Sequence, residues 1–177
     1  MTPQSEYAYY LDRFNLKDED VPAVPNLDAV MLQTLIRHAK AGTNGLWMTH
    51  WHEPIKTEYG ETSGEEINEE NWCKTTHCRA GYAVCLAGKE GWNLERRLDP
   101  EDAGIMIYFK SVGHHPNFYA GTEDALYDII KHAVKQGFTP TTADLKILSV
   151  RYAIEVDQAR KVIDNTLKGK FDDDDEE

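Results

Sequence analysis

The residues that could do chemistry gather between Trp72 and Gly88, in the stretch W-C-K-T-T-H-C-R-A-G-Y-A-V-C-L-A-G. This stretch holds all three cysteines of the chain and a histidine. Cys73 and Cys78 have the C-x4-C spacing of half a tetrahedral zinc site, although no second clear cysteine pair accompanies them. Imidazoles just upstream could complete the coordination. The zinc hypothesis therefore rests on five candidate ligands: Cys73, His77, Cys78, His50 and His52.

A reactive thiol is a second hypothesis for the same stretch. A helix N-terminus and a neighbouring imidazole both favour the thiolate form of cysteine, so Cys73 beside His77 could act as nucleophile and base. The sequence shows no acid to orient the histidine and no oxyanion hole, and we therefore predict no catalytic residue. The favoured interpretation is that Cys78 and Cys85 are small buried hydrophobic residues and that Cys73 packs beneath Trp72.

A helix is expected to position these side chains. Thr75 or Thr76 suits its N-cap, because a hydroxyl there accepts a bond from the first unpaired backbone N–H groups. The pattern predicts a helix over about residues 77–87. Its many small residues let neighbouring backbones approach closely, so we expect it at the centre of a packed domain. Cys78 and Cys85 are seven residues apart and should share one face of it.

The same stretch carries the pattern C-x-T-x-x-C-x-A-G-(aromatic)-A, formed by Cys73, Thr75, Cys78, Ala80, Gly81, Tyr82 and Ala83. This pattern resembles an element of small uncharacterised bacterial and phage proteins. The resemblance extends through G-W-N-L-E-R-R-L and N-F-Y-A-G-T-E-D-A-L, over residues 72–130. It implies a bacterial or phage setting, and it assigns neither an activity nor a catalytic residue.

Capping signals and apolar periodicity predict helices in much of the remaining chain. Asp99 followed by Pro100 reads as an N-cap and first helical position, and Thr141 with Asp144 matches a capping box. Apolar residues recur at helical spacing between Asn26 and Gly42. Helices are expected within 26–42 and 77–87, from 99, within 122–137, from 141, and in a last segment that ends at 169.

The predicted fold class is mainly α, a single compact helical domain of about five to six helices. L-W-M-T-H-W-H, residues 46–52, could form a short β-strand or an irregular aromatic segment. With 177 residues and 41% hydrophobic side chains, the chain suits one domain with a respectable core. We assign residues 1–171 to the domain and residues 172–177 to an acidic tail.

The other histidines are expected to be structural. His38 and His132 fall within predicted helices, where they are most simply surface or boundary residues. His114 and His115 lie together in a loop, where such pairs are more often solvated than bound to a ligand.

The net charge of -12 is concentrated in two places. The tail from Asp172 to Glu177 contributes six negative charges, and residues 53–71 contribute seven glutamates against one lysine. Such surfaces repel phosphate backbones and anionic membranes. They predict no direct binding to nucleic acid or membrane, and a protein with a basic surface as the natural partner.

The compartment is predicted from what the sequence lacks. It shows no signal-peptide pattern and no apolar run long enough to cross a bilayer. Three cysteines cannot all pair within the chain and give no secreted-type framework. We therefore expect a reducing cytoplasm.

These observations favour a small acidic protein that inhibits or adapts another protein by occupying its basic nucleic-acid-binding surface. No phosphate-binding glycine loop, nucleophile elbow or H-E-x-x-H motif is present, which argues against an enzyme without deciding it. One alternative is a metalloprotein or thiol enzyme built on Cys73, His77 and Cys78. Another is a helix-turn-helix regulator that uses the last two helices. Residues 139–170, which include them, hold six Lys or Arg and four Asp or Glu. The predicted partner-binding residues are Glu58, Glu61, Glu65, Glu66, Glu69, Glu70, Trp47 and Trp51.

Overall fold

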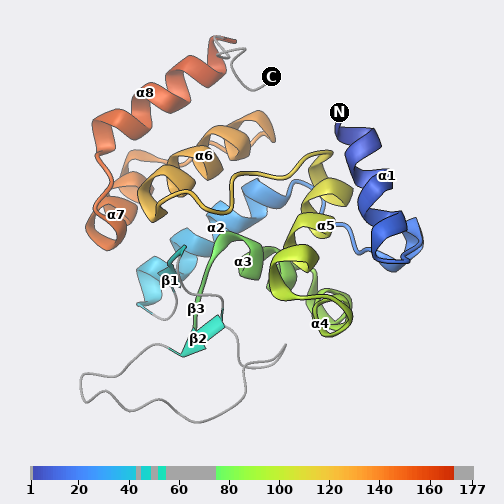
Figure 1. Ribbon diagram of the computed structural model, residues 1–177. Helices are drawn as coiled ribbons and strands as arrows, with labels where there is room; N and C mark the ends of the chain where they lie inside the picture. Colours follow the sequence, from blue (N-terminus) through green and yellow to red (C-terminus); the bar gives the residue numbers. More distant parts are fainter. Residues whose placement is uncertain (1, 43–44, 49–51, 55–74, 170–177) are drawn as a thin grey trace.

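The computed structural model describes residues 2–42, 45–48, 52–54 and 75–169, and these residues form a mainly helical, single domain (Figure 1). Their α-helices are α1 (Pro3–Arg13), α2 (Leu27–Ala41), α3 (Arg79–Leu86), α4 (Gly88–Arg97), α5 (Pro100–Val112), α6 (Thr122–Lys135), α7 (Thr142–Tyr152) and α8 (Val156–Leu167). A short 3-10 helix, η1 (Asp18–Asp20), follows α1. Three short strands are β1 (Gly45–Leu46), β2 (His52–Pro54) and β3 (Thr75–His77).

The mainly α fold class is confirmed, but the described residues hold eight α-helices rather than the five to six expected. The aromatic N-terminal segment is a full helix, α1, whose Thr2 side chain caps the Ser5 N–H. The predicted 77–87 helix is followed directly by a second one. Gly88 has a φ of +62°, a left-handed conformation that glycine adopts without steric cost, and it separates α3 from α4.

The helix starts that were predicted from capping residues are largely confirmed. Asp99 Oδ1 accepts from the Asp102 N–H at 2.8 Å, and Thr141 and Asp144 form the expected capping box. Asn26 precedes α2 as expected, but its own backbone is left-handed and its side chain forms no capping bond. The local sequence therefore determines the residue at which each of these helices begins. The atom that caps the helix can still differ from the expected one, as at Asn26.

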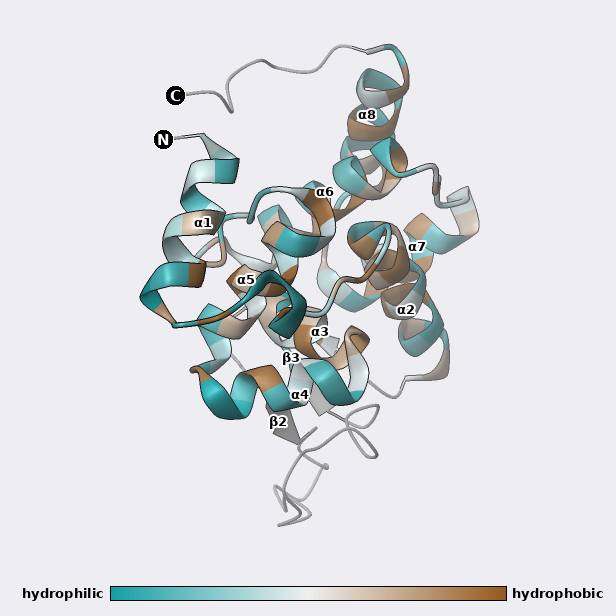
Figure 2. Ribbon diagram, turned by 90° about the vertical axis from the view of Figure 1, so that its right-hand side faces the viewer, coloured by the Kyte–Doolittle hydropathy of each residue, from teal (hydrophilic) through white to brown (hydrophobic). Residues whose placement is uncertain are grey.

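Four helices form the middle of the domain. α3 packs most extensively against α5, and α2 packs against α6, while α1 covers α5 and α8 covers α6. α1 and α8 consequently lie on opposite sides of the molecule (Figure 1). Hydrophobic residues concentrate on the inward-facing sides of these helices, and α4 and α8 turn hydrophilic residues outwards (Figure 2).

The small residues of α3 allow the close approach that the sequence indicated. A Cβ atom built on Gly104 of α5 would lie only 2.4 Å from Ala80 Cβ and 2.9 Å from Ala80 Cα. Both positions are fully buried or nearly so. The expectation of a central, closely packed α3 is therefore confirmed.

The three strands form one small sheet in the order β1-β3-β2. β1 is parallel to β3, with Leu46 opposite His77, and β2 is antiparallel to β3, with Pro54 opposite Thr75. Of the aromatic stretch 46–52, Leu46 ends β1 and His52 begins β2, while Trp47 and Met48 lie in neither strand. The described residues therefore do not form the single short strand that was one of its two predicted forms. None of the helices in the described ranges is long and apolar enough to cross a membrane.

The final two helices pack against each other, and α8 also lies along α6. Ala159 and Ile163 are buried, but Leu167 is 63% exposed because α8 ends there. α8 itself carries two basic and two acidic residues. Because these charges balance, the composition of α8 does not support DNA binding. A DNA-binding role for this helix pair stays a prediction.

Candidate functional site

The cysteine-rich segment turns from a strand into a helix at Cys78. Its Sγ atom accepts a hydrogen bond from the Gly81 N–H at 3.4 Å, so Cys78 is the N-cap of α3. The prediction that Thr75 or Thr76 is the N-cap was therefore wrong. Residues 75–77 pair within the sheet instead, and that extended conformation delays the helix until Arg79.

Both described cysteines are buried thiols, as the favoured interpretation held. Burial raises the pKa of Cys78 to about 11, more than the backbone N–H groups of α3 lower it. His77 is fully buried, and its Nδ1 atom lies 3.9 Å from the Sγ of Cys85. The described histidine–cysteine contact thus involves Cys85, which sequence spacing did not indicate; Cys73 lies outside the described residues.

The zinc hypothesis stays a prediction. His50 and Cys73 fall outside the described residues, and the side chain of His52 is not described. Among the side chains that are described, no group of three or more His, Cys, Asp or Glu is placed to hold a metal ion.

A buried ionic network around Arg79 is the most organised polar cluster in the described residues. The guanidinium donates from Nη2 to Asp28 Oδ1 at 2.7 Å, from Nη1 to Asp128 Oδ2 at 2.5 Å and from Nε to the Tyr108 hydroxyl at 2.8 Å. Its side chain is 2% exposed. One arginine on α3 therefore connects α2, α5 and α6.

Further donors satisfy the Asp28 carboxylate. The Tyr108 hydroxyl donates to Oδ1 at 3.0 Å, and Gln136 Nε2 donates to Oδ2 at 3.3 Å. Gln136 Oε1 also accepts from the Ala29 N–H at the start of α2. Burial raises the pKa of Tyr108 well above 10, so its hydroxyl keeps the proton that it donates. The interior of the network is thus fully hydrogen-bonded, as buried charges require.

The network reaches the surface at Asp128, whose side chain is 35% exposed. Oδ1 of Asp128 lies 3.3 Å from His132 Nε2, one turn further along α6. Burial would raise the pKa of Asp128, but the His132 hydrogen bond and the Arg79 charge outweigh it and hold the pKa well below 3.8. His114 stands beside His132, with a ring-centroid distance of 5.2 Å. Burial, and next the His132 charge, lower the pKa of His114.

Sequence reasoning missed this network. Arg79 is 51, 49 and 29 positions from Asp28, Asp128 and Tyr108, and no local pattern links such positions. His132 was expected at the surface or boundary and is a boundary residue, whereas His38 is buried. The available hint was an arginine placed among small and apolar residues of a helix predicted to be central.

Of the predicted partner-binding residues, the structure describes Trp47, which lies next to the small sheet. Trp47 directly follows β1, its N–H donates to the His77 carbonyl at 2.9 Å, and its side chain is 55% exposed. Trp51 and six of the predicted contact residues lie outside the described residues: Glu58, Glu61, Glu65, Glu66, Glu69 and Glu70. Pro54 and Thr75, which bound this acidic segment, are paired across β2 and β3.

A separate open groove lies between α2 and the start of α7, with a volume of about 650 Å³. Lys40 Nζ binds Asp144 Oδ1 at 2.8 Å across it. Its lining residues are Gln33, Ile36, Arg37, Lys40, Ala41, Phe138 and Asp144. In this ion pair the charges of Lys40 and Asp144 neutralise each other. No second feature of the described residues indicates a ligand for the groove.

Protein-family models, curated proteins and solved structures were compared with the chain, and none of them matches it. The resemblance to small bacterial and phage proteins remains an expectation from the sequence.

Proposed function

We propose that the chain is a protein-binding module that recognises a basic protein surface through its acidic segment from Glu58 to Glu70. In this proposal it acts as an inhibitor or adaptor that covers a nucleic-acid-binding surface of its partner. It works in the reducing cytoplasm of a bacterium or of a phage-infected cell, and it needs no cofactor.

The observation that carries the proposal is the pairing of Pro54 with Thr75. This pairing fixes both ends of the acidic segment at one place on the helical domain. Trp47 lies in the same small sheet, because β1 pairs with the other edge of β3. An exposed tryptophan therefore follows a strand of the same small sheet whose Pro54 and Thr75 flank the glutamate-rich segment.

The charge distribution supports the same surface. Residues 58–70 hold six glutamates and no Lys or Arg. The tail at residues 172–177 carries the other run of six acidic residues. Concentrated charge of one sign speeds encounter with an oppositely charged protein, and a large aromatic side chain supplies the affinity that such charge lacks.

The first experiment is capture from a host-cell lysate with the full chain, followed by mass spectrometry. We expect a stoichiometric basic partner that the parent retains and that a quadruple variant retains poorly. That variant changes Glu65, Glu66, Glu69 and Glu70 to Gln. A basic protein of unrelated function, egg-white lysozyme, is added as a measure of non-specific charge attraction.

Binding kinetics with the captured partner at two ionic strengths then test the mechanism. The quadruple variant should associate about tenfold more slowly at low salt, and this difference should shrink as salt screens the charges. Trp47→Ala should instead speed dissociation, because it removes an anchor rather than a charge. Removal of residues 172–177 should matter less, since a tail must be ordered before it makes fixed contacts.

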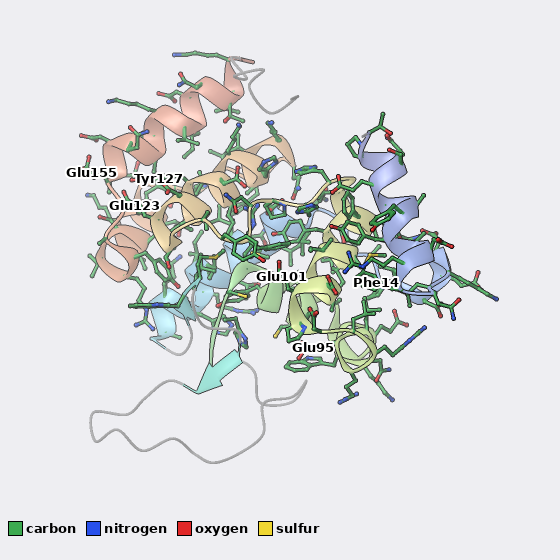
Figure 3. All side chains as sticks on the ribbon, in the orientation of Figure 1. Phe14, Glu95, Glu101, Glu123, Tyr127 and Glu155 are labelled. Atoms are coloured by element: carbon green, nitrogen blue, oxygen red, sulfur yellow. The ribbon has the colours of Figure 1, made fainter. Side chains whose placement is uncertain are left out.

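The matched control variant neutralises four exposed acidic side chains that lie on helices rather than in the acidic segment: Glu90, Glu123, Asp157 and Asp164. Glu123 lies with Tyr127 and Glu155 where α6 meets the start of α8, whereas the base of the acidic segment is in the sheet (Figure 3). If the control slows association as much as the quadruple variant, overall charge explains binding and the proposed surface is wrong. Equal, salt-insensitive rates for all variants would also refute the proposal.

A further inference from the structure

The Arg79 guanidinium pairs with two carboxylates, those of Asp28 and Asp128. Among the other described partners of these carboxylates, Tyr108 and Gln136 are uncharged at neutral pH. His132, which contacts Asp128, is charged only when it is protonated. A buried cluster with a net negative charge gains from one additional proton at its edge.

Two histidines stand at that edge. His132 contacts the free oxygen of Asp128 at 3.3 Å, and its side chain is 14% exposed. The half-buried ring of His114 lies 5.2 Å from it, centroid to centroid. The groups that face His114 are His132 and Asp128 from α6, Asp28 from α2 and the Val112 backbone of α5, with Arg79 from α3 behind both carboxylates.

His114 belongs to the loop of residues 113–121, which joins α5 to α6 and passes across the domain between them (Figure 1). Elsewhere this loop is held by Phe118, which packs edge-on against the Tyr108 ring at 5.5 Å, and by Tyr119, whose hydroxyl donates to Glu101 at 2.6 Å. His115 faces the opposite direction and lies 3.4 Å from Glu6 of α1.

We propose that His114 and His132 form a two-histidine clasp that holds residues 113–121 against α6 while the pair carries at most one proton, and that opens when a second proton binds. A protonated His132 pairs with Asp128 at 3.3 Å and adds one positive charge to the network. A second proton, on His114, places two like charges on facing rings in a half-buried site, where such repulsion is only partly screened.

The sign of the pH dependence follows from the His114 environment. Burial and the neighbouring His132 lower the pKa of His114 from 6.5, and the two aspartates offset this only in part. The folded state therefore binds fewer protons than the unfolded chain just below pH 6.5, and the clasp loses stability as the pH falls through that range. On the α1 side of the loop, His115 Nε2 lies 3.4 Å from Glu6 Oε1. Loss of the His114–His132 contact therefore frees only the α6 side of the loop.

The test uses the full chain and two residue-specific measurements between about pH 8 and about pH 5. NMR follows the ring resonances of each histidine, and hydrogen exchange, corrected for its intrinsic pH dependence, follows the amides of residues 113–121. A local measurement is needed because burial also lowers the pKa of His38, so global stability changes with pH as well. In the parent we expect the His114 titration to depend on the charge of His132. Loop protection should fall by about tenfold, which corresponds to about 1.4 kcal/mol in the free energy of loop opening.

Three variants separate the clasp from a general effect of acid. His114→Asn removes the second proton site, so loop protection should change by less than about twofold over the same range. His132→Asn should raise the pKa at which His114 titrates. His115→Asn, the neighbouring control, should retain the tenfold loss of the parent.

A tenfold loss that persists in His114→Asn overturns the proposal. If that variant does not fold, the parent and His132→Asn still decide it. A His114 ring that titrates in one step, unchanged by the loss of His132, shows that the two rings are independent and the clasp does not exist.

Discussion

Arg79 of α3 and Asp28 of α2 form a salt bridge of 2.7 Å in the centre of the domain, although 51 positions separate them in the sequence. Their side chains are 2% and 1% exposed. Because two desolvated charges are stable only as a pair, each residue depends on the other's helix being in place. The bridge therefore makes the packing of α2 against α3 a condition for burying either charge.

Arg79→Met should lower the free energy of unfolding by about 3–5 kcal/mol, the usual cost of leaving one partner of a buried pair uncompensated. Urea unfolding followed by circular dichroism measures this loss. A double variant, Arg79→Met with Asp28→Asn, should lose less than the sum of the two single changes, because it leaves no unpaired charge on Asp28.

Arg160→Met is the control for that experiment. Arg160 pairs with Asp157 at 3.6 Å on the surface of α8, and both side chains are exposed. Such pairs contribute about 0–1 kcal/mol. Equal losses for Arg79→Met and Arg160→Met would show that the buried network does not stabilise the domain.

Gly104→Ala should destabilise the contact between α3 and α5. The new methyl group would lie 2.4 Å from Ala80 Cβ and 2.9 Å from Ala80 Cα, so the two helices must separate. Overpacking of this kind costs about 1–3 kcal/mol, which outweighs the gain of about 1 kcal/mol in helix propensity when alanine replaces glycine. Thermal melting of the variant against the parent measures the net loss.

Gly121→Ala provides the matched glycine change outside the packed core. A Cβ there would lie 3.9 Å from Asp124 Oδ2, an ordinary contact, and the backbone φ of -63° suits alanine. Alanine is a poorer N-cap than glycine, so a loss below about 1 kcal/mol is expected. A Gly104→Ala protein that melts at or above the parent's temperature would contradict the described α3–α5 contact.

Acid should weaken the domain through Asp128. Its pKa lies well below 3.8, because the His132 hydrogen bond and the Arg79 charge outweigh the raising effect of burial. The folded state thus binds fewer protons than the unfolded chain, and the stabilisation is present above pH 3.8 and lost as the pH falls through it. Asp128→Asn should flatten the loss of stability between about pH 5 and about pH 3, whereas Asp157→Asn should not. Parallel profiles for both variants and the parent, from urea unfolding, would contradict this assignment.

The sequence predicted those features of the fold that depend on near neighbours. Asp99 with Asp102, and Thr141 with Asp144, act within one helical turn, so their capping bonds could be predicted from spacing. The prediction failed at Thr75 and Thr76 because β-pairing with a distant segment competes with the helix. The sequence pattern predicted one helix over about residues 77–87 and did not predict the second helix, α4, which starts at Gly88.

The candidate sites were predicted less well for the same reason. The burial of Cys78 and Cys85 follows from residue type and local pattern. The exposure of Trp47 does not follow from its type, since tryptophan is buried on average. The partners of Arg79 come from three other helices, and the contact of His77 with Cys85 crosses from a strand to a helix. Such pairs depend on how helices pack, which a single sequence does not encode in any short interval.

Cys78 should resist alkylation in the folded protein. Burial raises its pKa from 9.0 to about 11, so the reactive thiolate is about a hundredfold rarer at neutral pH than in the unfolded chain. Labelling with iodoacetamide before and after unfolding, with mass spectrometry of the peptides, measures the rate at each cysteine separately. Cys85, which is 3% exposed, should be protected by burial as well. Rapid labelling of Cys78 in the folded state would contradict its structural role and favour the thiol-enzyme alternative.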